Sequence, residues 1–82
     1  MKFTGAVINE QGIDFSIIQV KPGYLTQQNL QSIQNQAPIN FPRPVILAEQ
    51  TTDGYKYLGR PDIVNFLSGI YVEQIPWQNY SV

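Results

Sequence analysis

Residues 57–67, with the sequence YLGRPDIVNFL, join the end of one strand to the start of an amphipathic helix. Pro61 suits the first helical position, because its fixed φ matches the helix and the N–H that it lacks is not needed there. Asp62 follows in the first turn, where it interacts favourably with the positive end of the helix dipole. The buried face shows the i, i+3, i+4, i+7 spacing, at Ile63, Phe66, Leu67 and Ile70. Gly69 is expected to end this helix in the left-handed conformation.

A hairpin is expected directly before this junction. Its strands are Val45–Thr52 and Tyr55–Leu58, which are rich in strand-forming residues. The Asp-Gly dipeptide at 53–54 lies between them, and this dipeptide is among the strongest signals for a tight hairpin turn.

The N-terminal half shows the same order of a hairpin followed by a helix. Phe3–Ile8 and Ile13–Val20 are the expected strands, joined by a short turn that contains a glycine. Both faces of the second strand carry apolar residues, which indicates a central strand that is partly covered on each side. Thr26 is expected to cap a helix over 27–36, because its hydroxyl accepts an amide hydrogen of the first turn.

Two further segments complete the predicted fold. The proline-rich segment Pro38–Pro44 is expected to be an ordered loop, and Tyr71–Ile75 is a candidate fifth strand before the C-terminal tail. A chain of 82 residues allows a single domain, residues 1–82. The element order predicts the α+β class, with a small antiparallel or mixed sheet of four to five strands and both helices on one face.

The composition excludes several kinds of function. The chain contains no cysteine and no histidine, so disulfides, thiolate nucleophiles, most zinc sites and the commonest general base are absent. We therefore expect no metal and no cofactor. No stretch approaches the roughly 20 apolar residues of a membrane helix, and a small domain without disulfides is typical of the cytoplasm.

The charge is low and dispersed. The net charge is −1, and the basic residues are scattered along the chain, at Lys2, Lys21, Arg43, Lys56 and Arg60. Nucleic-acid binding normally requires a basic patch, so it is expected only if the fold gathers Arg43, Lys56 and Arg60 on one side. Gln and Asn together outnumber all charged residues. This excess reflects either composition bias on a solvated surface or a surface that forms neutral hydrogen bonds with a partner.

Candidate catalytic groups are few. Paired acids flank the two hairpin turns, at Glu10 and Asp14 and at Glu49 and Asp53. Glycosidase chemistry needs two carboxylates at a fixed separation, but acids beside turns are common as solvated residues. The serines have no histidine to activate them, and no spacing supports a dyad with Lys21 or Lys56. We predict no catalytic residues and no enzyme.

The candidate binding residues are aromatic and basic, namely Tyr55, Tyr57, Trp77, Lys56 and Arg60. Tyrosine and tryptophan dominate binding hot spots, and Tyr55 and Tyr57 share one face of their strand while Lys56 points the other way. Arg60 at a helix start is suited to a carboxylate or phosphate.

These residues lead to two hypotheses of different kinds. The first is a non-enzymatic protein-interaction domain that forms a homodimer or binds another protein through its sheet edge or aromatic C-terminal region. The second is a small-molecule or anion-binding domain, or a carboxylate-dependent enzyme, that uses the helix start at Arg60. Nucleic-acid binding is a third and weaker hypothesis.

Overall fold

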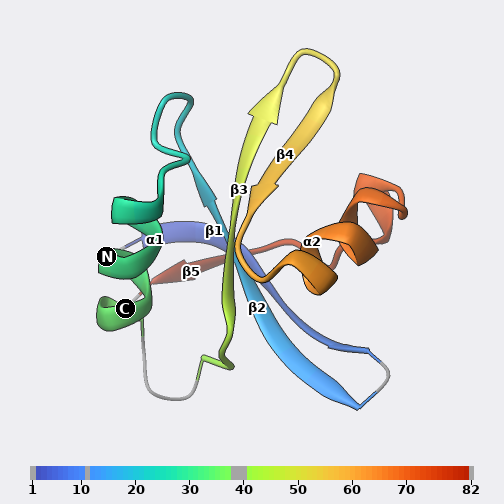
Figure 1. Ribbon diagram of the computed structural model, residues 1–82, viewed down its shortest axis with the longest axis horizontal. Coiled ribbons are helices and arrows are strands. Elements are labelled where there is room, and N and C mark those ends of the chain that lie inside the picture. Colours follow the sequence, from blue (N-terminus) through green and yellow to red (C-terminus); the bar gives the residue numbers. More distant parts are fainter. Residues whose placement is uncertain (1, 11, 38–40, 82) are drawn as a thin grey trace.

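The computed structural model describes residues 2–10, 12–37 and 41–81, so part of the predicted loop 38–44 lies outside the described residues. The α+β order is confirmed. The elements are β1 (Lys2–Glu10), β2 (Ile13–Val20), α1 (Gln27–Gln36), β3 (Val45–Thr51), β4 (Gly54–Leu58), α2 (Pro61–Ser68), the 3₁₀ turn η1 (Val72–Gln74) and β5 (Gln78–Ser81) (Figure 1).

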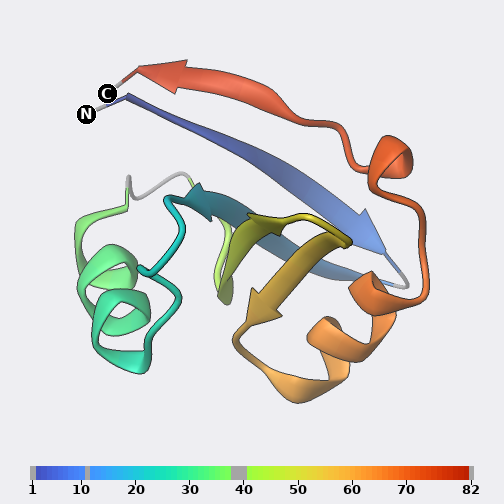
Figure 2. The same ribbon diagram turned by 90° about the horizontal axis from the view of Figure 1, so that it is seen from above.

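The five strands form one mixed sheet in the order β4-β3-β2-β1-β5. β2 and β3 are parallel, and the other neighbouring pairs are antiparallel. β2 is central, as its two apolar faces predicted. Figure 2 shows β5 (red) returning beside β1 (blue), at the edge of the sheet opposite to β4.

The two helices cover opposite faces of the sheet, so the prediction that both lie on one face is wrong (Figure 1). Ile18 and Leu47, which are opposite each other in β2 and β3, belong to the apolar cluster of α1. Their chain neighbours Ile17 and Ile46 belong to the cluster of α2. All four side chains are at most 2% exposed. A parallel strand pair that is apolar on both faces needs a cover on each face.

The connections between strands explain this arrangement. α1 lies on one face and links the parallel neighbours β2 and β3, because parallel strands require a crossover connection. α2 and η1 carry the chain across the other face, from β4 at one edge to β5 at the other. The last strand of the chain thereby pairs with the first strand, β1, and becomes the edge of the sheet.

Local predictions have mixed outcomes. Thr26 caps α1, whose bounds are those predicted, and the backbone N–H of Asn29 donates to the Thr26 hydroxyl at 3.2 Å. Gly69 ends α2 with φ −96° and ψ −2°, so the predicted left-handed conformation is wrong. The predicted strand Tyr71–Ile75 is also wrong, since these residues surround the turn η1, and the last strand is Gln78–Ser81. The Gln74 side chain accepts the Tyr71 backbone N–H at 2.9 Å, which stabilises the turn locally.

Arg43 has a structural position at the end of α1. Its guanidinium donates to the backbone carbonyls of Gln34 at 2.7 Å and Ala37 at 3.1 Å. The last carbonyls of a helix have no partner within the helix, and they carry partial negative charge. Arg43 therefore supplies hydrogen-bond donors to carbonyl groups at the C-terminal end of α1. It also connects this helix to the segment that leads into β3.

We expect Gly59→Ala to lower the free energy of unfolding by roughly 2–4 kcal/mol. Gly59 has φ +156°, and an added Cβ would lie 2.4 Å from Ile46 Cδ1 and 3.3 Å from the Val45 carbonyl oxygen. Ile46 is fully buried and has little freedom to move. Urea denaturation followed by circular dichroism measures the change.

Gly69→Ala is the matched control for this substitution. Its added Cβ would meet nothing closer than the Phe66 carbonyl oxygen at 3.5 Å, and its φ suits any residue. We expect a change within about 1 kcal/mol. Equal losses in both variants would contradict a specific constraint at the junction of β4 and α2.

Candidate functional site

Three of the five predicted binding residues lie together on the face that α2 covers. The ring of Tyr55 stacks on that of Trp77, with centroids 5.3 Å apart and planes at 23°, and it also lies beside Tyr57 at 6.3 Å and 16°. We call Tyr55, Tyr57 and Trp77 the aromatic row. Ala48, the register partner of Tyr57 in β3, is fully buried, and its small side chain leaves room above the sheet for these rings.

The aromatic row is part of the core on its inner side. All three rings are partly buried and pack against the cluster of α2. Burial raises the pKa of the Tyr57 phenol, and the neighbouring Tyr55 raises it further. Beside the row, Tyr71 is 77% exposed. It lines a hollow of about 410 Å³ between β4 and the end of α2, together with Tyr55 and Tyr57.

The two basic candidates lie apart from the aromatic row. Lys56 belongs to the opposite face of β4, where its register partner in β3 is Glu49. Arg60 precedes α2 and forms an ion pair with Asp62, with Nε and Oδ1 2.8 Å apart and both side chains about half exposed. Arg43, the third cation considered for nucleic acid, binds the end of α1. Nucleic-acid binding stays a prediction.

The acid pairs beside the turns have other neighbours. The Asn9 amide donates to the Asp14 carboxylate, and the Glu49 carboxylate accepts the Gly23 backbone N–H at 3.4 Å. Glu49 and Asp53 line different hollows. Within residues 2–10, 12–37 and 41–81, no group of three or more acidic side chains is placed to hold a metal ion. In the same described ranges, no helix has the length and apolar character needed to cross a bilayer.

The strand β4 forms one edge of the sheet. It is the last strand in the order, so no strand among the described residues pairs with its outer side. The outer backbone N–H and C=O groups of an edge strand can pair with another strand. The aromatic row follows this edge on one face, and Lys56 lies on the other.

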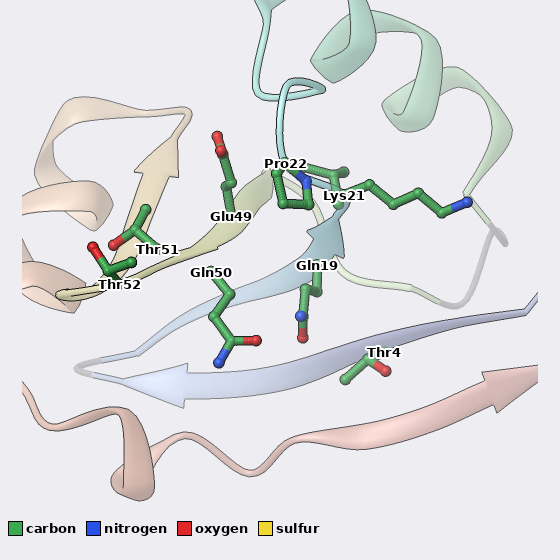
Figure 3. Close-up of a pocket in the computed structure, with 9 residues that line it drawn as sticks. Thr4, Gln19, Lys21, Pro22, Glu49, Gln50, Thr51 and Thr52 are labelled. Carbon is green, nitrogen blue, oxygen red and sulfur yellow. The ribbon is translucent and has the colours of Figure 1, made fainter.

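A second feature is a hollow of about 710 Å³ at the carboxyl ends of the parallel strands β2 and β3. Gln19 and Gln50 extend into it from these two strands, on the same side of the sheet, and Thr4 lines it from the neighbouring strand β1 (Figure 3). Lys21 and Glu49 also line the hollow, but their charged groups extend away from the two amides (Figure 3). We call this feature the polar hollow.

Sequence reasoning did not single out Thr4, Gln19 or Gln50. The excess of Gln and Asn was the available signal, but it marks no particular position. Strand alternation assigns each side chain to a face, but only the parallel pairing of β2 with β3 places Gln19 and Gln50 at the same hollow. That pairing depends on long-range contacts, which a local pattern does not contain.

Comparison with protein-family models, with curated proteins and with solved structures found no match for this chain. The aromatic row, the open edge of β4 and the polar hollow are therefore the observations from which a function can be inferred.

The raised pKa of Tyr57 predicts a loss of stability at alkaline pH. As the pH rises through about 10, the unfolded chain releases the Tyr57 proton before the folded chain does. The unfolded state then binds fewer protons, so the free energy of unfolding falls with increasing pH. We expect Tyr57→Phe to make this fall shallower in urea denaturation between about pH 9 and pH 11.

Tyr71→Phe removes a phenol of the same kind from an exposed position and serves as the control. We expect this variant to follow the pH dependence of the unmodified chain. If both variants flatten the curve equally, burial in the aromatic row does not cause the effect.

Proposed function

We propose that this chain is a non-enzymatic protein-interaction domain that forms a homodimer through β4. The open edge of β4 is the observation that carries the proposal. Pairing of two such edges would join two five-stranded sheets into one, because main-chain hydrogen bonds supply affinity in strand addition. The proposed compartment is the cytoplasm, where a domain without cysteine needs no oxidising environment.

The length of β4 favours one register. In an antiparallel pair of identical strands, all five residues Gly54–Leu58 are paired only when Lys56 lies on the two-fold axis. Tyr55 of each copy is then opposite Tyr57 of the other, on the face of the aromatic row. Aromatic pairs directly across two strands contribute roughly 0.2–1 kcal/mol each. The aromatic row would thus continue from one copy into the next.

The charges near the edge limit the strength of this contact. Lysine on an edge strand opposes pairing with another sheet, and in this register the two Lys56 side chains are neighbours. Glu49 lies directly beside Lys56 in each copy, so the row across the interface contains two acids and two bases. The net charge of −1 per chain adds little repulsion between copies. We therefore expect a weak and reversible dimer.

The alternative hypothesis, a small-molecule or anion-binding domain at the start of α2, has less support. Its main candidate, Arg60, already has a carboxylate partner in Asp62. An incoming anion would have to displace this partner or share the guanidinium with it.

We expect the unmodified chain to shift from the 9.3 kDa monomer towards twice that mass as its concentration rises. Light scattering after size exclusion measures this shift. Lys56→Glu should abolish it, because four carboxylates would then lie in one row across the interface. A monomer at every concentration would contradict the proposal.

Single cysteine variants locate the contact, since the chain has no cysteine of its own. Lys56→Cys should form a disulfide-linked dimer on mild oxidation, because residue 56 lies on the proposed axis. Asn79→Cys is the matched control, with an exposed residue on the opposite edge strand, β5. Faster cross-linking at position 79 than at position 56 would place the contact at β5 and contradict the proposed contact at β4.

A further inference from the structure

We infer that the polar hollow binds an uncharged, hydroxyl-rich ligand, namely a short neutral oligosaccharide. The hollow, of about 710 Å³, is within the size range of sites for small molecules. It lies on the part of the sheet that α2 leaves uncovered, at the carboxyl ends of β2 and β3. This inference does not depend on self-association through β4.

Two neutral carboxamides project into the hollow, and both are open to a ligand, since Gln19 is half-buried and Gln50 is exposed. Gln19 and Gln50 form no hydrogen bond through their side chains within the part of the chain that the structure describes, although both project into the hollow (Figure 3). A carboxamide offers donors and an acceptor together, and each hydroxyl of a sugar also donates and accepts. The two sets of groups are therefore complementary.

The polar groups continue across the sheet beyond the hollow. The Thr4 hydroxyl donates to the Asn79 side-chain oxygen at 2.9 Å, which leaves the lone pairs of Thr4 and the amide hydrogens of Asn79 available. By strand alternation, Asn79, Thr4, Gln19 and Gln50 all lie on the face of α2, on four neighbouring strands. Neighbouring strands are about 4.8 Å apart, a spacing similar to the length of one sugar ring. This row suits a ligand of more than one ring.

Charge and apolar surface also favour a neutral sugar. Lys21 and Glu49 carry opposite charges and extend away from the amides, so the hollow offers an ion no net attraction (Figure 3). Tyr55 is the register partner of Gln50, and it places the aromatic row beside the hollow. The negative face of an aromatic ring attracts polarised C–H groups, such as those of a sugar ring.

Nuclear magnetic resonance titration of the ¹⁵N-labelled chain tests this inference. The neutral probes are cellobiose, maltose and sucrose, and the charged probes are glutamate and inorganic phosphate. We expect at least one neutral probe to shift the side-chain NH₂ signals of Gln19 and Gln50. Gln50→Ala should weaken that binding roughly three- to tenfold, the effect of losing one neutral hydrogen-bonding group.

Gln28→Ala is the control, because Gln28 is an exposed glutamine on α1 that does not line the hollow. It should bind as the unmodified chain does. The inference is overturned if no neutral probe shifts the two signals, if only glutamate or phosphate shifts them, or if Gln50→Ala binds with unchanged affinity. Oligomeric state measured in the same samples separates this result from the proposed dimer.

Discussion

The parallel pair β2–β3 is buried on both faces, and the rest of the structure depends on this constraint. Ile17 and Ile46 pack towards α2, while Ile18 and Leu47 pack towards α1. Fully burying an aliphatic side chain of this size is worth about 1.5–3 kcal/mol, so neither face can be left to water in so small a domain. One helix on each face meets this requirement, and each half of the chain supplies one.

The same constraint determines which surfaces remain free. The two helices and the aromatic row cover the middle of the sheet, and β5 pairs with β1 at one side. Among the described residues, no strand or helix covers the outer edges of β4 and β5 or the carboxyl ends of β2 and β3. The proposed dimer contact uses the edge of β4, and the proposed sugar site uses the carboxyl ends of β2 and β3. The dimer contact uses main-chain groups of β4 and the sugar site uses side chains of β2 and β3, and the two meet where Tyr55 pairs with Gln50.

The aromatic and basic candidates show how far local patterns reach. Alternation along β4 correctly separated Tyr55 and Tyr57 from Lys56. The pattern did not show that Trp77 stacks on Tyr55, because Trp77 is distant in sequence and reaches this face through η1. Nor did it show that Arg43 binds the end of α1 while Arg60 pairs with Asp62. Contacts of this kind depend on how distant segments pack in the folded chain. They determine which charged side chains remain accessible to a binding partner.

The sequence alone was enough for the number and order of most elements, the bounds of α1, its Thr26 cap and the hairpin at 53–54. These features depend on neighbours within a few residues, through caps, turn glycines and apolar spacing. Three features were decided only in the folded chain. They are the sides of the sheet that the helices cover, the turn at 72–74 in place of a strand, and the position of Gln19 and Gln50 at one hollow. Apolar residues on both faces of β2 were visible in the sequence and were consistent with a cover on each side. They could not show which helix covers which face, because that depends on pairing between strands that are far apart in the chain.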